Sequence, residues 1–160
     1  MKINNYTGNL AWICLPFQQL TVEQLYTILR LRNRVFVVEQ NCVYEDTDNK
    51  DQEAYHLMAW HDGKLLAYTR LFKPGDFYDA ASIGRVLTAP EVRGTQMGKE
   101  LMQRSIQQVY ALWGPVPIHI SAQLYLKKFY SAFGFQPVSD VYLEDGIEHI
   151  AMEKMTIAIP

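Results

Sequence analysis

The stretch Val86–Met102, V-L-T-A-P-E-V-R-G-T-Q-M-G-K-E-L-M, decides the interpretation of the whole chain. A strand-like run leads through Arg93 and Gly94 into a helical pattern that carries Gly98 in its first turns. A helix N-terminus presents unpaired N–H groups and a partial positive charge, and glycines let an anion approach the backbone closely. Arg93 and Lys99 add positive charge, so the stretch is compatible with a diphosphate site. The stretch lacks the P-loop and dinucleotide fingerprints, so an ordinary helix that starts at a glycine explains it equally well when it is taken alone.

Outward from this stretch, the chain reads as one α/β domain over residues 1–160, with a mixed central β-sheet flanked by helices. Apolar residues at helical spacing predict helices over Thr21–Arg34, Gly94–Trp113 and Leu124–Phe133. Alternating or β-branched runs predict strands over Ala54–Trp60, Leu65–Phe72, Ala81–Thr88, Val116–Ala122, Phe135–Glu144 and Ile147–Met155. The pairs Asp62-Gly63 and Asp145-Gly146 predict two hairpin turns.

Composition excludes several classes of protein. The chain has 160 residues, 49% of them hydrophobic, and a formal net charge of −2, which argues against disorder and against a basic nucleic-acid binder. It shows no signal-peptide pattern and no apolar run of about 18 residues, so we expect a cytoplasmic protein that is not in a membrane. Cys14 and Cys42 have no metal-ligand spacing and read as inert thiols, and we expect no metal.

A second stretch, Ala122–Val138, reads A-Q-L-Y-L-K-K-F-Y-S-A-F-G-F-Q-P-V. Gln123 ends a predicted strand, and Tyr130 lies seven residues later on the following helix. The aromatic residues of that helix can also be a core stripe, which is the simplest explanation for Phe129 and Phe133.

Together the two stretches resemble motifs A and B of the GNAT acetyltransferases. Arg93-Gly94-Thr95-Gln96-Met97-Gly98 takes the place of the motif A pattern R/Q-x-x-G-x-G/A, with Gln96 where the middle glycine usually stands. The places of motif B are taken by Gln123, Leu126, Phe129, Tyr130, Gly134 and Phe135. Gln123 replaces the usual asparagine and Leu126 the usual alanine. The runs L-R-N-R-V-F-V-V-E-Q-N-C-V-Y-E-D and Y-L-E-D-G-I-E-H resemble the ElaA-like branch of this superfamily.

The resemblance implies a GNAT fold in which two parallel strands, Ala81–Thr88 and Val116–Ala122, splay apart around the co-substrate acetyl-CoA. It implies direct transfer of the acetyl group, in a ternary complex, to a primary amine of a small molecule or a protein lysine. Tyr130 is then expected to protonate the departing thiolate. The residues expected to bind acetyl-CoA are Val86, Leu87, Thr88, Arg93, Gly94, Thr95, Gln96, Met97, Gly98, Lys99, Gln123, Phe129 and Tyr130.

The acceptor side is less defined by the sequence. Glu39 and His149 are candidate bases, and each also reads as an ordinary structural residue. The acidic segment Asn41–Glu53 is either a solvated surface loop or a region that attracts a cationic amine. A homodimer is compatible with the sequence. A non-catalytic acyl-CoA-binding domain and an acyl-homoserine-lactone synthase are the alternative functions for the same architecture.

Overall fold

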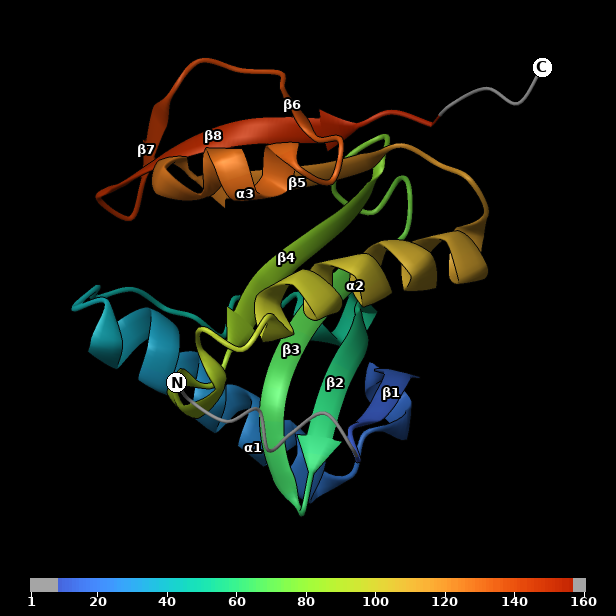
Figure 1. Cartoon of the computed structure of the whole chain (residues 1–160), viewed down its shortest axis with the longest axis vertical. Helices are drawn as coiled ribbons and strands as arrows, with labels where there is room; N and C mark the ends of the chain where they lie inside the picture. Colours follow the sequence, from blue (N-terminus) through green and yellow to red (C-terminus); the bar gives the residue numbers. More distant parts are fainter. Residues whose placement is uncertain (1–8, 157–160) are drawn as a thin grey trace.

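The computed structural model describes residues 9–156, which form an open eight-stranded sheet with helices on both faces (Figure 1). The strand order is β1-β2-β3-β4-β5-β8-β6, and β7 pairs with β8. The strands are β1 (Ala11–Pro16), β2 (Tyr55–His61), β3 (Lys64–Phe72), β4 (Ala81–Thr88), β5 (Ile118–Gln123), β6 (Gln136–Pro137), β7 (Tyr142–Glu144) and β8 (Ile147–Lys154). The main helices are α1 (Val22–Arg32), its π-helical continuation η2 (Asn33–Glu39), α2 (Met97–Trp113) and α3 (Lys127–Ser131). The short 3-10 turns are η1 (Phe17–Gln19), η3 (Asp51–Glu53), η4 (Pro90–Val92) and η5 (Leu124–Leu126). No helix within residues 9–156 is long and apolar enough to cross a lipid bilayer.

Local sequence signals explain where α1 begins. Gln24 N–H donates to Thr21 Oγ1 (3.1 Å), and Thr21 N–H donates to Gln24 Oε1 (2.9 Å), which is a capping box. Ile28 and Leu31 lie buried on the face that packs against the sheet. The predicted helix over residues 21–34 is therefore confirmed, and it continues as a π-helical turn to Glu39.

The helix α2 begins at Met97, three residues later than the sequence predicts. Gly94 and Gln96 have φ angles of 78° and 68°, and left-handed residues cannot belong to a right-handed helix. The loop therefore runs to Gln96 before the helix starts. The predicted end at Trp113 is confirmed, since Gly114 follows with a φ of 78°.

Two other expectations need correction, and the edge strand β1 was not predicted at all. The predicted helix Leu124–Phe133 is a 3-10 turn followed by the five-residue α3. The predicted strand Phe135–Glu144 is wrong as a continuous element, because within it only the short segments β6 and β7 form strands that pair with β8. Pro137 cannot donate to a ladder, and Ser139 turns its hydroxyl to the Asp140 carbonyl.

The sheet opens between β4 and β5, as Figure 1 shows. These parallel strands pair only at Ala81↔Ile118 and Ser82↔His119, and then they diverge. Close to this point the register between β3 and β4 shifts: Arg70 pairs with Gly84, and Tyr68 pairs with Leu87. One β3 residue therefore opposes two β4 residues, which is a β-bulge that bends β4 away from β5.

The two faces of the sheet carry different helices. Thr69 on β3 bonds Ser105 of α2 (2.9 Å), which places α2 against one face. Because strand side chains alternate, Arg70 points to the other face, where the guanidinium of Arg32 from α1 lies beside the same Asp51 carboxylate. We call these the α2 face and the α1 face. The apolar residues Ile120 and Ala122 of β5 lie in one buried cluster with α2 and α3 residues, so the side chains between them point to the α1 face.

Candidate functional site

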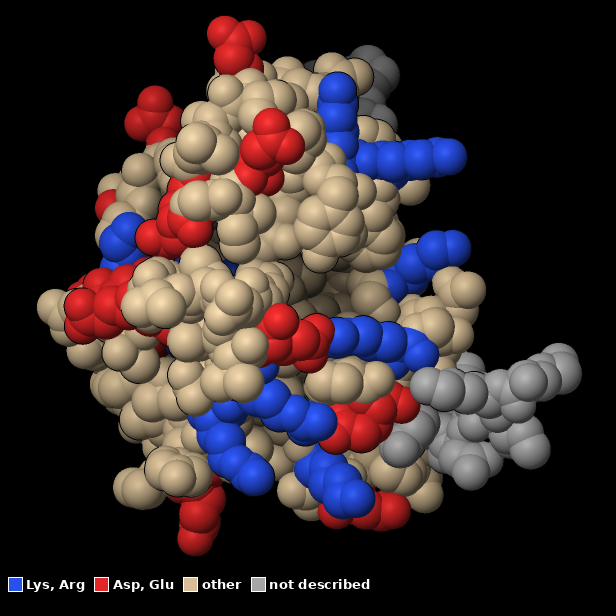
Figure 2. Space-filling model, turned by 90° about the vertical axis from the view of Figure 1, so that its left-hand side faces the viewer, with Lys and Arg blue, Asp and Glu red and all other residues tan. Residues whose placement is uncertain are grey.

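A cleft of about 880 Å³ occupies the place where β4 and β5 part, and Figure 2 shows a hollow on the corresponding side of the molecule. In that view Lys and Arg side chains lie to the right of the hollow and below it, while Asp and Glu predominate to its upper left. The predicted site residues that line the cleft are Glu39, Val86, Leu87, Thr88, Arg93, Gln123, Tyr130 and His149. A second cavity of about 300 Å³ adjoins it at the start of α2 and is lined by Thr88, Val92, Arg93, Gly94, Gln96, Met97, Gly98, Lys99 and Phe129.

All but one of the predicted acetyl-CoA residues therefore line one of two adjacent cavities. The exception is Thr95, which lines neither and whose hydroxyl donates to the Val92 carbonyl. A threonine hydroxyl beside its own loop backbone competes for local hydrogen bonds, so this side chain stabilises the loop.

The start of α2 has the form of an anion cradle. The N–H groups of Lys99 and Glu100 both donate to the Gln96 carbonyl (3.1 and 3.2 Å). Met97 and Gly98 precede them in the helix, so their N–H groups have no intrahelical acceptor and carry the positive end of the helix dipole. Gln96 adopts the left-handed conformation that explains why a glycine is usual at this place in motif A.

Tyr130 lies at the cleft with most of its side chain buried. Its ring makes edge contacts with Phe129 (centroids 5.1 Å apart) and Phe135 (6.2 Å). Burial raises the pKa of Tyr130 above its ordinary value, so the phenol keeps its proton at neutral pH. Within residues 9–156 no hydrogen-bond partner of its hydroxyl is seen, so the donor is available to a molecule in the cleft.

His149 reaches the cleft from β8, on the α1 face directly opposite Gln123. Its Nδ1 lies 2.7 Å from the Ile147 carbonyl, and because a carbonyl only accepts, Nδ1 carries the hydrogen. In the neutral ring Nε2 then has the lone pair, and it lies 3.6 Å from a carboxylate oxygen of Glu144. Tyr142 stacks on the same ring. Nε2 is therefore in a position to accept a proton from a molecule in the cleft.

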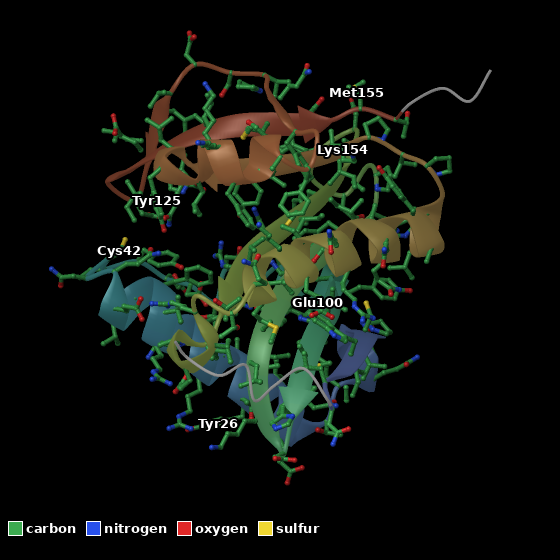
Figure 3. All side chains as sticks on the ribbon, viewed as in Figure 1. Tyr26, Cys42, Glu100, Tyr125, Lys154 and Met155 are labelled. Atoms are coloured by element: carbon green, nitrogen blue, oxygen red, sulfur yellow. The ribbon has the colours of Figure 1, made fainter. Side chains whose placement is uncertain are left out.

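Glu39 is differently placed. Its carboxylate forms an ion pair with Arg93, so it joins the end of η2 to the loop before α2. Two further contacts cross the cleft: Gln123 Nε2 donates to Gln40 Oε1 (3.3 Å), and Cys42 Sγ donates to the Asp145 carbonyl (3.4 Å). Figure 3 shows Cys42 on one side of this opening and Tyr125, also a lining residue, on the other. These contacts bridge the two sides of the cleft.

The expectation of a solvated loop holds for Glu45 and Glu53 of the acidic segment 41–53, which are exposed, but the central carboxylates are neither solvated nor part of an open cation-attracting surface. Asp46 and Asp51 are 7% exposed and pair with Arg32, which is fully buried (Nε–Oδ2 2.8 Å and Nη1–Oδ1 2.6 Å). Asp48 pairs with Arg70 (2.7 Å). The partners lie 14 to 22 residues away along the chain, so no local pattern predicts these pairs.

This charge network also holds the bulge of β4. Arg85, at the bulge, has a φ of 50°, a conformation that costs a non-glycine residue about 1–2 kcal/mol. Its guanidinium is held by Asp46 (Nε–Oδ1 2.9 Å) and by Asp48 (3.4 Å). Strained residues persist where their surroundings over-determine them. The acidic loop thus contributes to the site by fixing the backbone that opens the cleft.

The network predicts a loss of stability in acid. Arg70 and Arg85 outweigh burial and lower the pKa of Asp48 to about 2, and Arg32 and Arg70 lower that of Asp51. Burial lowers the pKa of His56. All three groups bind fewer protons folded than unfolded, so their contributions are full at high pH and are lost as the pH falls. The thermal unfolding midpoint, a temperature, should start to decrease when the pH is lowered past about 6.5, because His56 then takes up a proton in the unfolded chain. It should decrease more steeply between about pH 4 and 2, where the two carboxylates take up protons.

Circular dichroism melts between pH 8 and 2.5 measure this dependence. The Asp48→Asn variant should be less stable at pH 7 and should lose less between pH 5 and 2.5. A midpoint that stays constant from pH 7 to 3 would contradict the paired state of these carboxylates.

The family described as "Acetyltransferase (GNAT) domain" matches residues 19–156. The chain is 41% identical over 150 residues to protein ElaA of Escherichia coli strain K12, with 92% of this chain and 98% of ElaA covered. The crystal structure of E. coli ElaA matches with a TM-score of 0.85 at 40% identity, over 91% of this chain and 99% of that one.

Two further solved structures are informative. An acyl-CoA N-acyltransferase from Pseudomonas aeruginosa matches with a TM-score of 0.88 at 44% identity, over 91% of this chain and 99% of that chain. An aminoglycoside 6'-N-acetyltransferase complexed with coenzyme A shares the fold, with a TM-score of 0.68 at 17% identity, over 92% and 99% of the two chains. All of these structures therefore share the fold of this chain.

Proposed function

The chain belongs to the GNAT acetyltransferase family, and on that basis we propose that it transfers an acetyl group from acetyl-CoA to a primary amine. The observation that carries the proposal is the continuous site formed by the α2 anion cradle, the gap between β4 and β5, and the buried Tyr130 hydroxyl at that gap. A non-catalytic acyl-CoA binder needs the first two features but has no use for a protonated phenol beside the sulfur.

Acetyl-CoA fits this site by its chemistry. The diphosphate is anionic and matches the free N–H groups of Met97 and Gly98, with the charges of Arg93 and Lys99 beside them. The pantetheine arm carries amides, and the edges of β4 and β5 beyond Ser82 and His119 have no strand partner in the gap, so those amides can pair with them as an added strand would.

The reaction proceeds by direct attack. A primary amine has a pKa of about 10.4, so a base must first remove a proton from the bound ammonium. His149 is better suited than Glu39, because Nε2 has a free lone pair with Glu144 beside it, whereas the Glu39 carboxylate is engaged by Arg93. The neutral nitrogen attacks the thioester carbonyl, and a backbone N–H near Leu87 stabilises the oxyanion. The C–S bond then breaks, Tyr130 donates its proton to the sulfur, and the second nitrogen proton returns to the phenolate through solvent.

The α2 cradle gives a prediction about binding. A Cβ at Gly98 would meet only Phe129 Cζ, at 3.9 Å, so an alanine fits without strain. A leucine would project into the 300 Å³ cavity where the diphosphate is expected. We expect Gly98→Leu to fold normally and to bind acetyl-CoA at least about tenfold more weakly, as overpacking a complementary site costs about 1–3 kcal/mol.

Isothermal titration calorimetry measures this affinity, with Gly98→Ala as the matched control that retains most of it. Unchanged affinity in Gly98→Leu, with the unfolding midpoint preserved, would show that the diphosphate lies elsewhere.

The activity itself is tested by the release of free thiol from acetyl-CoA. The purified chain is incubated with n-butylamine, spermidine, an aminoglycoside, free lysine and a lysine-containing peptide, each at several concentrations. We expect a rate that saturates with at least one amine and is absent without it. Tight binding of acetyl-CoA with no amine-dependent release across the panel would favour the non-catalytic alternative.

A further inference from the structure

At two glycine positions of the described chain, the backbone conformation does not require a glycine. Six others have positive φ angles, where a side chain is strained: Gly63, Gly75, Gly94, Gly114, Gly134 and Gly146. Gly84 and Gly98 have no such angle, so any residue could adopt their backbone conformation. Both line a cavity, and Gly98 lies in the diphosphate cradle described above.

Gly84 lies in the middle of β4, where glycine is unfavourable. A glycine inside a strand loses conformational entropy and packs no side chain, and it typically marks a close approach of a ligand or another backbone. No heavy atom of the described residues, apart from its two chain neighbours, lies within 4 Å of the position that its Cβ would occupy. No packing within the described chain therefore requires a hydrogen at this place.

The position of Gly84 indicates a role for the open space where its side chain would lie. It is the second residue after the last β4–β5 pair, Ser82↔His119, and the first before the bulge at Arg85, so it forms the floor of the gap. It pairs with Arg70, and its missing side chain would point to the α1 face. We propose that Gly84 is the floor of the acceptor pocket and sets the width of the amine that the enzyme accepts.

The α1 face, rather than the α2 face, is the acceptor side of the gap. Tyr130 and the α2 cradle lie on the α2 face and serve the acyl donor. His149 and Ser121 point to the α1 face, as does Gly84, and all of them line the same cleft. An amine that reaches the thioester from this side passes over Gly84 with the base His149 across the gap.

Some of the side chains that line the cleft together with Gly84 are held by their own contacts. The Tyr78 ring stacks on His119 with centroids 3.9 Å apart, and Arg70 is 4% exposed and paired with two carboxylates. A methyl group at Gly84 would meet none of them and would occupy open space of the cleft. The acceptor class that we infer is a primary amine whose carbon beside the nitrogen lies in that space, and an unbranched CH₂ group, as in an alkylamine, a polyamine or a lysine side chain, needs the least room there.

The proposal rests on the proposed function. Gly84→Ala tests it through two effects, a higher unfolding midpoint and a lower kcat/KM, which a purely structural role of Gly84 would not produce together. Removing a strand glycine whose backbone angles suit alanine should raise the unfolding midpoint by about 1–4 °C. The same methyl group should lower kcat/KM for n-butylamine at least about tenfold, and the loss should be larger for sec-butylamine, which is branched beside the nitrogen. The Kd for acetyl-CoA should stay unchanged in calorimetry.

Gly63→Ala is the matched control. Gly63 lies in the β2–β3 turn with a φ of 73° and does not line the cleft, so this variant should be less stable with unchanged turnover. A lower unfolding midpoint in Gly84→Ala would show that the glycine is needed for stability. Weaker binding of acetyl-CoA would show that the acyl donor, and not the amine, occupies the space beside Gly84. Either result, or unchanged turnover of both amines, overturns the proposal.

A binding readout separates this inference from the proposed function. In ¹H–¹⁵N spectra of the wild-type protein with saturating CoA, n-butylamine should shift the amide signals of Ser82, Gly84 and His119, and Gly84→Ala should abolish the shifts. If these shifts occur without turnover, the proposed function fails and the pocket stands. If turnover occurs and these signals do not move, the acceptor binds elsewhere.

Discussion

Tyr130→Phe is expected to lower kcat at least tenfold while the affinity for acetyl-CoA stays near that of the wild type. The variant keeps the ring, its edge contacts with Phe129 and Phe135, and its burial, and it removes only the hydroxyl. A general acid typically contributes about 10²–10⁴-fold, because it neutralises charge that builds up on the leaving atom only in the transition state. The raised pKa of Tyr130 keeps the proton on the phenol throughout the neutral range.

The measurement is the steady-state rate of thiol release with the best amine of the panel, together with calorimetric binding of acetyl-CoA. Tyr125→Phe is the matched control, since this tyrosine also lines the cleft but is 75% exposed and free to turn to solvent. Unaltered kcat in Tyr130→Phe would refute the acid assignment. A variant that loses its cooperative melt would show that Tyr130 is instead a core residue.

Arg32→Met is expected to lower the free energy of unfolding by about 3–5 kcal/mol, the largest effect on stability that the structure predicts. Arg32 is fully buried and donates to Asp46, Asp51 and the Asp46 carbonyl at 2.6–2.8 Å. Methionine matches much of its length but leaves two buried carboxylates short of a cation, and an uncompensated buried charge is the costly part of a broken pair.

Urea unfolding followed by circular dichroism gives this free energy. The control is Arg30→Met, the same change in the last turn of α1 at an exposed position, where we expect a change within about 0.5 kcal/mol. Arg32→Lys should recover only part of the loss, because an ammonium cannot reproduce three directed bonds from one planar group. A loss below about 1 kcal/mol in Arg32→Met would mean that the network contributes little to the fold.

Local signals explain why most of the fold could be predicted from the sequence. Thr21 and Gln24 form the predicted capping box, Gly114 ends α2, and the Asp62-Gly63 turn joins β2 to β3. These features depend on residues close together in the chain. The edge strand Ala11–Pro16 was missed because its apolar run has no clear alternation, and its pairing depends on β2, whose partner residues lie 39 to 49 positions along the chain.

The candidate site also has parts that local sequence predicts and parts that depend on residues far apart in the chain. The α2 cradle and Tyr130 each belong to a contiguous motif, so their places could be predicted, and the structure puts them in two adjoining cavities. The role of the acidic loop could not be predicted, because the arginines that pair with Asp46 and Asp48 lie on α1, β3 and β4. One local signal was present: Arg32 lies on the apolar side of a predicted helix, and a charged residue at such a position indicates a buried ion pair.

Gly84 was missed for a different reason. In the sequence it is one glycine inside a β-branched run, which reads as a bulge or a weak strand. Only the structure shows that the φ angle of Gly84 does not require a glycine and that the space beside it opens into the cleft.

The central claim is that acetyl passes directly from acetyl-CoA to an amine. Of the two cysteines, Cys14 is a poor nucleophile, since burial raises its pKa to about 12, and Cys42 lines the cleft with its thiol directed at the Asp145 carbonyl. Mass spectrometry of a single-turnover mixture of protein, acetyl-CoA and the best amine tests the claim most directly. The account predicts one N-acetylated amine for each CoA thiol released, with the protein mass unchanged at every time point and Cys42→Ala fully active. An acetylated cysteine that forms and decays with turnover, or thiol released without acetylated amine, would contradict it.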